Sequence, residues 1–255
     1  MVENSTNNVQ LVSIVETMLN LLDARSKDVI VRRFGLRSDQ KETLESIGKK
    51  YGITRERVRQ IEANAKKALA DLKNHYEPAH EVFIEVFRKH GGVMAEPHVV
   101  TAVADHTNED LTQNQIVFYL VILPGFIGAP STSVFAPHWR YEPVVHSRGD
   151  DVVRAAIEFL KEKKHPVSQE AILHAVRSTL DVSEEDVPTT VIIAALTASQ
   201  QVDPTVFGEW GLSHWPETRP RGVGDKAYAV LRRNDKPAHF REITQLINDA
   251  QFDGK

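Results

Sequence analysis

The sequence predicts a mainly α-helical protein, in which an N-terminal helix-turn-helix is followed by tandem three-helix modules with small β elements. Two observations lead to this fold class. Residues 43–69 combine helical periodicity with a central glycine, and a pattern of amphipathic helices recurs along the chain at offsets of 73 and about 71 residues. Short aromatic segments close the first two copies and predict the β elements, at Val134–Trp139 and Val206–Trp210.

Residues 43–69 predict two short amphipathic helices joined at Gly52. Thr43 and Thr54 suit the N-caps, because their hydroxyl groups accept backbone N–H bonds in the first turn. Gly52 suits the left-handed conformation that ends a helix. The predicted inward side chains are apolar: Leu44, Ile47 and Tyr51, then Val58, Ile61, Ala65, Ala68, Leu69 and Leu72. This is the layout of a helix-turn-helix that enters the major groove of DNA.

The outward side of the second helix carries the side chains that major-groove recognition requires. Arginine bonds guanine bidentately, glutamine bonds adenine, and glutamate accepts from the cytosine amino group. Arg55, Glu56 and Gln60 lie in the first two turns, after the cap Thr54, and are the predicted base contacts. The predicted phosphate contacts are cations: Arg57, Arg59, Lys49, Lys50, Lys66 and Lys67. The alternative is a solvated helix surface held by i,i+4 ion pairs.

Three strings between residues 22 and 72 carry a family resemblance: Arg33-Phe34-Gly35-Leu36, Thr43-Leu44-Glu45 and the unbroken Gly52–Glu62, GITRERVRQIE. The segment resembles region 4 of the sigma-70 family of bacterial transcription initiation factors. The resemblance implies that the second helix recognises the promoter −35 element and that the module docks on the flap of the RNA polymerase β subunit. By position, Arg55, Glu56 and Gln60 would contact bases, while Arg57 and Arg59 would contact the backbone or support the helix.

The same resemblance sets an expectation for what the chain does not do. In the sigma-70 family, promoter melting belongs to a separate upstream region, and some twenty residues precede the match here. We therefore expect the chain to be placed at promoters without opening them itself.

Charge is unevenly distributed along the chain. Residues 25–73 contain 14 Lys and Arg against 7 Asp and Glu, whereas the rest contains 17 against 28. A basic module on an acidic body fits a protein that binds nucleic acid with one part and proteins with others. The absence of Cys excludes disulfides, thiolate catalysis and cysteine zinc fingers. No apolar run approaches about 18 residues and the N-terminus lacks a signal-peptide pattern, so we expect a cytoplasmic, nucleoid-associated protein without membrane contact.

The repeated modules are predicted to be winged helices. Each of the first two copies continues into an apolar third helix, Ile116–Leu123 or Val191–Leu196, before its β element. The first of these helices is almost entirely apolar and the second has no Lys or Arg, so we do not expect them to recognise DNA. Binding of protein surfaces and structural packing between modules are equal alternatives.

The third copy carries a second resemblance in Asp225-Lys226-Ala227-Tyr228 and in Pro237–Ile243, PAHFREI. It is similar to the start of a HARE-HTH domain, a winged-helix family that includes the N-terminal domain of the RNA polymerase δ subunit. This copy ends before a third helix and a wing, so we expect either truncation or packing on a neighbour. The predicted domains are 1–75, sigma region 4-like; 76–145 and 146–218, winged-helix-like; and 219–255, a partial HARE-HTH domain.

No catalytic or metal-binding constellation is predicted. His80-Glu81 begins like a metalloprotease helix but lacks the second His, and Arg219–Gly224 lacks the lysine and hydroxyl of a phosphate loop. We predict a non-enzymatic, cofactor-free bacterial transcription factor that binds promoter double-stranded DNA and RNA polymerase. The alternatives are a polymerase accessory subunit acting through protein contacts and the DNA-targeting part of a restriction or modification protein.

Overall fold

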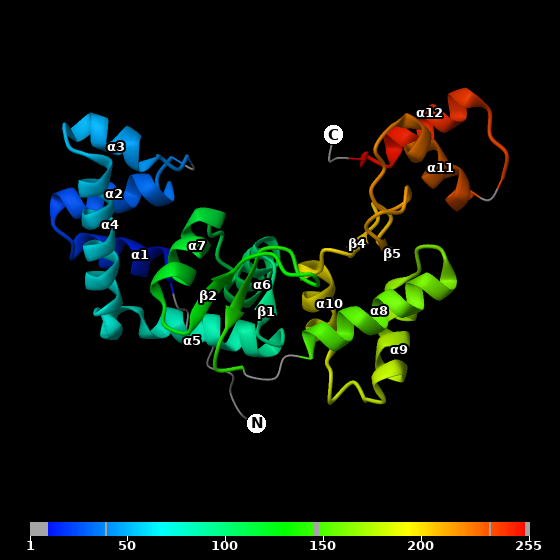
Figure 1. Ribbon diagram of the computed structural model, residues 1–255, viewed down its shortest axis with the longest axis horizontal. Helices are drawn as coiled ribbons and strands as arrows, with labels where there is room; N and C mark the ends of the chain where they lie inside the picture. Colours follow the sequence, from blue (N-terminus) through cyan, green and yellow to red (C-terminus); the bar gives the residue numbers. More distant parts are fainter. Residues whose placement is uncertain (1–9, 39, 145–147, 235, 253–255) are drawn as a thin grey trace. The chain divides into compact units, whose positions relative to one another are not determined.

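The computed structural model describes residues 10–38, 40–144, 148–234 and 236–252. It is mainly helical with a few short antiparallel strands, as predicted (Figure 1). The chain forms two compact units. Unit 1 comprises the residues up to 129 and residues 139–145, and unit 2 comprises residues 130–138 and the residues from 146 onward.

Unit 1 begins with a group of four helices and continues with a mixed module. The helices are α1 (Leu11–Asn20), α2 (Ala24–Phe34), α3 (Leu44–Tyr51) and α4 (Arg55–Ala70). The module consists of α5 (Lys73–Lys89), β1 (Val93–Met94), α6 (Glu96–Thr107), α7 (Gln113–Ile122), β2 (Phe126–Ala129) and β3 (His138–Tyr141). The strands form an antiparallel sheet in the order β1-β3-β2, in which Val93 pairs with Arg140 and Met94 with Trp139.

The core of the helix-turn-helix follows the predicted apolar stripes. Its buried members come from three helices: Val29, Ile47, Val58 and Ile61. Leu44, Tyr51 and Ile53 pack against them and are half-buried. Ala68 was wrongly predicted to face inward, and the structure leaves it exposed. At roughly 100° per residue, Ala68 lies at the edge of the sector centred on Val58.

The helix-turn-helix and the first repeat share one packed unit, so the predicted boundary at residue 75 does not separate compact units. Helix α1 packs on α5, and α7 packs on both α2 and α4. The Phe118 ring of α7 meets Phe34 of α2 edge-on at 5.3 Å between centroids. Asn114 Nδ2 donates to the Gly35 carbonyl at 3.2 Å. Helix α7 is apolar around most of its circumference, and such a helix needs cover on more than one side.

Unit 2 repeats the order of elements found in the module of unit 1. It contains α8 (Gly149–Lys163), α9 (Gln169–Leu180), α10 (Thr189–Ala198), β4 (Val202–Pro204) and β5 (Trp210–Leu212). Strands β4 and β5 pair antiparallel, with Asp203 opposite Gly211. A bridge between Val167 and Trp210 occupies the place of the β1–β3 pairing in unit 1. This correspondence matches the repeat seen in the sequence.

The predicted β segments coincide only in part with the strands. The segment predicted at Val134–Trp139 reaches strand β3 only from His138 onward, while Phe135 forms an isolated bridge with Ser199. The segment predicted at Val206–Trp210 is mostly a turn, and β5 starts at its last residue. Strand β2 was not predicted; it begins at Phe126, shortly after α7 ends at Ile122.

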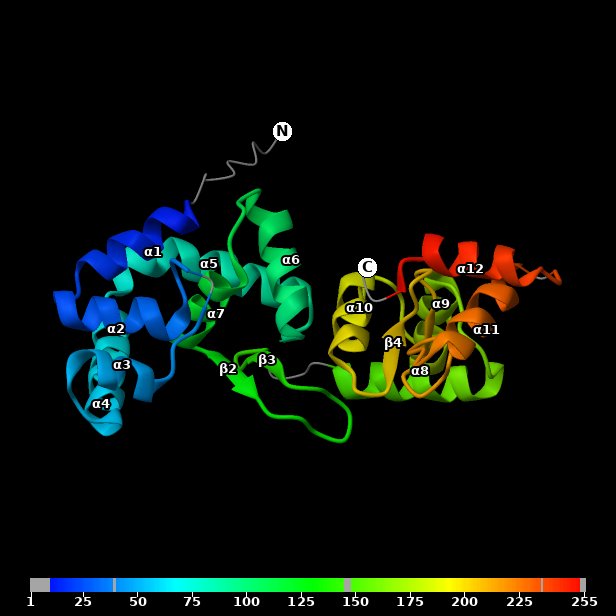
Figure 2. The ribbon, with the colours of Figure 1, turned by 90° about the horizontal axis from the view of Figure 1, so that it is seen from above.

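The third copy consists of α11 (Val223–Asn234) and α12 (Phe240–Asp249), which lie side by side (Figure 2). Ala229 and Val230 of α11 pack with Phe252, and Phe207 from the β4–β5 turn of the second repeat joins them. Among the described residues of α12 none is fully buried, and Phe240 is 64% exposed. The third copy therefore docks on the second repeat through a small apolar cluster.

Candidate nucleic-acid interface

The turn between α3 and α4 has the predicted caps. Thr43 Oγ1 accepts from the Ser46 N–H at 3.1 Å, and Thr54 Oγ1 accepts from the Arg57 N–H at 3.2 Å. Gly52 ends α3 in the left-handed conformation with φ of 62°. All three predictions are confirmed. The caps fix where α3 ends and α4 begins, and the exposed first turn of α4 follows directly.

The structure leaves all the predicted contact residues exposed except Lys66. The exposed members on and before α4 are Thr54, Arg55, Glu56, Arg57, Arg59, Gln60 and Lys67, and those on α3 are Lys49 and Lys50. Glu56, Gln60 and Lys67 are spaced by four and seven residues, so they lie along one face of α4. We call the exposed face formed by Arg55, Glu56, Arg59, Gln60 and Lys67 the α4 ridge.

Side chains of the α4 ridge interact with one another. Arg59 donates to both Glu56 carboxylate oxygens, at 2.7 and 2.8 Å, and this hydrogen bonding holds the pKa of Glu56 below its ordinary value. Gln60 Nε2 lies 3.4 Å from the same carboxylate, and Gln60 Oε1 accepts from Arg57 at 3.2 Å. Exposed ion pairs contribute little to stability, so these groups can exchange their partners for bases or phosphates.

A shallow cleft of 510 Å³ lies beside the turn, between α3 and the start of α4. Lys49, Arg55 and Arg57 line it together with one carboxylate, Glu45, and with residues of the turn up to Thr54. The free N–H groups and the dipole at a helix N-terminus favour an anion, and three cations strengthen that preference. Lys49 also pairs with Glu45 at 3.0 Å on the exposed surface. The cleft therefore suits a phosphate of the DNA backbone.

Lys66 lies in a different environment from the other predicted phosphate contacts. Its Nζ is 2.5 Å from a carboxylate oxygen of Glu62 and 5.4 Å from the centroid of the Phe34 ring. The Glu62 side chain is only 10% exposed, and its other oxygen is 3.1 Å from Arg33 Nε. Sequence reasoning missed Glu62 because a glutamate on an amphipathic helix is expected to face solvent. The signal that could have found it is its spacing, four residues after Val58 and three before Ala65, which places it in the apolar sector of α4.

A second polar network holds α2 to α3. Arg32 contacts Asp28 and Glu42 at 2.6 Å each, and the Tyr51 hydroxyl donates to Asp28. Arg33 also donates to the Glu42 carbonyl at 2.5 Å. Glu42 immediately precedes the α3 cap, so these bonds fix the entry into the helix-turn-helix.

Three carboxyl groups of these networks have lowered pKa values. Burial would raise the pKa of Glu62, but the hydrogen bonds and positive charges of Lys66 and Arg33 outweigh it. Burial would likewise raise the pKa of Asp28, but the hydrogen bonds from Arg32 and Tyr51 and the charge of Arg32 outweigh it. The hydrogen bond from Arg32 is the main cause of the lowered pKa of Glu42. A carboxyl group with a lowered folded-state pKa stabilises the fold above its unfolded pKa and loses that contribution as the pH falls.

We therefore expect unit 1 to lose stability as the pH falls through the ordinary values of 4.5 for Glu and 3.8 for Asp. Hydrogen exchange of α2–α4, corrected for intrinsic rates, should show weaker protection at about pH 4 than at about pH 6. Glu62→Gln removes one of the titrating groups, so its protection should change less with pH. Equal protection of the wild-type chain at both pH values would contradict this expectation.

The third helices of the two repeats are covered along most of their length. In α7, Ile116, Phe118, Tyr119 and Leu120 are fully buried. Helix α10 packs on α8 and β4, and its residues are buried or half-buried. The sequence prediction would place these helices in the recognition position of a winged helix, but they are largely buried. The exposed α4 ridge is therefore the better candidate for contact with a groove of DNA.

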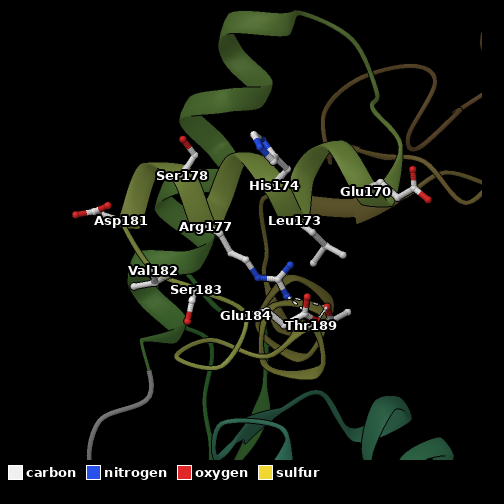
Figure 3. Close-up of a pocket in the computed structure, with 10 residues that line it drawn as sticks. All are labelled: Glu170, Leu173, His174, Arg177, Ser178, Asp181, Val182, Ser183, Glu184 and Thr189. Carbon is white, nitrogen blue, oxygen red and sulfur yellow. Dashed lines mark hydrogen bonds and ion pairs between the residues drawn. The ribbon is translucent and has the colours of Figure 1, made fainter.

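A larger cleft of 720 Å³ lies in unit 2, between α9 and the segment that leads to α10 (Figure 3). Arg177 points across it, with Nη2 at 2.8 Å from Thr189 Oγ1 and 3.3 Å from Glu184. Glu170 and Asp181 also line the cleft. The arginine is engaged within the chain and the remaining charges are negative, so this cleft does not suit a phosphate backbone.

The described part of the chain shows neither a metal-binding cluster nor a membrane-spanning helix. Within the described ranges, no three His, Asp or Glu side chains converge so that they could hold a metal ion. In the same part of the chain, no helix combines the length and the apolar character needed to cross a bilayer.

A capped pair of helices with a charged, exposed second helix defines a helix-turn-helix of the DNA-binding type. Comparison with known proteins then gives the family of this module: residues 18–71 match the family described as "Sigma-70, region 4". The match includes the end of α1 and the whole of α2, α3 and α4. Unit 1 thus contains a sigma-70 region 4 domain.

Several curated relatives are RNA polymerase sigma factors. RpoS of Coxiella burnetii is 48% identical over 65 residues, which are 26% of this chain and 18% of the relative. RpoD of Helicobacter pylori is 54% identical over 56 residues, 22% of this chain and 8% of the relative. SigA of a Bacillus species is 47% identical over 55 residues, 22% of this chain and 15% of the relative. The chain spans less than a fifth of the length of these relatives, so the similarity concerns the module alone.

Proposed function

We propose that the protein is a bacterial sequence-specific transcription factor that recognises a −35-type promoter element with α4. The observation that carries the proposal is the placement of Arg55, Glu56 and Gln60, which are exposed on the first two turns of a capped helix. These turns are the ones that enter the major groove in helix-turn-helix proteins. The same residues lie inside the segment that matches sigma-70 region 4.

RNA polymerase is the proposed protein partner. The relatives matched over this module are RNA polymerase sigma factors by name. That similarity supports contact with polymerase, and we propose the flap of the β subunit as the docking site. The proposal concerns unit 1, which contains the matched residues.

The remaining modules are proposed to be degenerate winged helices at 76–145 and 146–218, followed by a partial HARE-HTH domain at 219–255. The repeated order of three helices and a small β element supports this assignment. Because α7 and α10 are covered, these modules would act through packing and protein contacts.

The test is selection of bound sequences from randomised DNA duplexes by the full chain. We expect a short motif to be enriched, and Arg55→Ala or Gln60→Ala should each relax preference at one position, at a cost of about 1–3 kcal/mol. The control is Lys67→Ala, which should weaken all duplexes alike and reduce the salt slope of binding by about one unit. A uniform loss of affinity in the Arg55 and Gln60 variants, with the motif unchanged, would contradict base recognition.

A polymerase accessory subunit is the second candidate function. The burial of α7 and α10 and the acidic character of the chain beyond residue 73 favour it. Tight binding to purified core RNA polymerase without an enriched DNA motif would support this candidate over the first.

A further inference from the structure

Glu62 is a nearly buried carboxylate on α4, on the side that faces α2. It is held by two cations, Arg33 Nε at 3.1 Å and Lys66 Nζ at 2.5 Å. Lys66 also covers the face of the Phe34 ring. We call Arg33, Glu62 and Lys66 the Glu62 cluster.

Moving Lys66 away from Glu62 would cost free energy, because the Glu62 carboxylate is nearly buried. A buried carboxylate that loses a counter-ion is strongly destabilising, since neither water nor another charge replaces the lost interaction. If Lys66 turned toward a DNA phosphate, Glu62 would keep Arg33 alone. Lys67, the next residue, is exposed on the α4 ridge and bears no such cost.

The cluster also connects both helices of the motif to α2. Arg33 contacts Glu62 of α4 and donates to the carbonyl of Glu42, which directly precedes the α3 cap. Phe34, the next residue of α2, packs between Lys66 and Phe118 of α7. The direction of α4 relative to α3 is thus set partly by this polar contact, in addition to the apolar core.

We propose that Arg33, Glu62 and Lys66 are positioning residues that orient α4 for DNA, and that Lys66 does not contact phosphate. This inference rests on the proposed DNA-binding function and replaces the assignment of Lys66 as a phosphate contact. Its consequence is that neutralising Lys66 and neutralising Lys67 affect DNA binding in different ways.

The experiment compares Lys66→Met with Lys67→Met in the full chain, by measuring Kd for a fixed duplex over a series of salt concentrations. Lys67→Met should reduce the slope of log K against log salt by about 0.9, the value for one phosphate contact. Lys66→Met should weaken binding several-fold at every salt concentration and leave the slope unchanged. Lys66→Arg keeps the charge beside Glu62 and should restore the wild-type Kd. Circular dichroism at the binding temperature checks that each variant is folded.

Two outcomes would overturn the inference. A slope reduced by about one unit in Lys66→Met would show a phosphate contact. An unchanged Kd with only a lower melting temperature would show a purely structural role. A cycle of Glu62→Gln, Lys66→Met and the double variant adds an independent measurement, because coupled residues give a double loss of melting temperature smaller than the sum of the single losses. Additive losses would count against the cluster.

Failure of the proposed function is distinguishable from failure of this inference. A wild-type chain that enriches no motif would reject sequence-specific recognition. The salt slopes on a nonspecific duplex and the melting-temperature cycle would still decide the role of Lys66.

Discussion

Replacing Phe118 with alanine is expected to destabilise unit 1 by about 3–5 kcal/mol, the usual cost of removing a fully buried aromatic side chain. Phe118 is inaccessible to solvent and meets the Phe34 ring at 5.3 Å. Its helix packs on α2 and α4 of the helix-turn-helix. The cavity would therefore open between the sigma region 4 domain and the first repeat, and both should lose stability together.

Hydrogen exchange resolved along the chain measures this effect, because protection should fall in α4 and in α5 alike. Val121→Ala is the matched control. Val121 lies on the same helix but is 39% exposed, so its substitution should change stability by less than about 0.5 kcal/mol. If α3 and α4 stayed fully protected in Phe118→Ala, the helix-turn-helix would be stable independently of the first repeat. That result would contradict a shared core and support a domain boundary at residue 75.

The helix-turn-helix could be predicted closely because its signals are local. Thr43 and Thr54 cap the helices that follow them, and Gly52 has the positive φ that its position demands. Each of these features depends on residues within one turn of the chain. The exposed position of Glu56 and Gln60 follows from the helical periodicity, since both lie opposite Val58 at roughly 100° per residue. Local chemistry therefore predicts both the motif and most of the candidate interface.

What could not be predicted depends on contacts between distant segments. The apolar sequence of α7 predicts a buried helix but not that Phe34, 84 residues away from Phe118, covers it. The pairing of Glu62 with Lys66 is local, at i,i+4, but its contact with Arg33 of α2 joins segments that are distant in the sequence. A charged side chain on an amphipathic helix is expected to face solvent. Only the packed structure shows that Glu62 is nearly buried and paired with two cations.

Substituting Gly48 with alanine is the second change with a large expected effect. Gly48 is buried in α3, and a Cβ atom there would lie 2.7 Å from the Ile53 carbonyl oxygen. The obstacle is backbone, and the Ile53 N–H already donates to the Gly48 carbonyl at 3.0 Å. The turn must therefore move away from α3, at a cost of about 1–3 kcal/mol.

The displacement would carry the start of α4 with it, since Thr54 and Arg55 directly follow Ile53. We therefore expect Gly48→Ala to lower DNA affinity even at temperatures at which the chain is folded, measured as Kd beside a urea unfolding curve. Gly52→Asn is the matched control, because its site has open space and asparagine tolerates the left-handed conformation, so its cost should stay below about 1 kcal/mol. If Gly48→Ala lost no more stability than Gly52→Asn, the turn would accommodate the added Cβ atom. If Gly48→Ala bound DNA with the wild-type Kd, DNA binding would not depend on the position of the turn, and this would count against recognition by the α4 ridge.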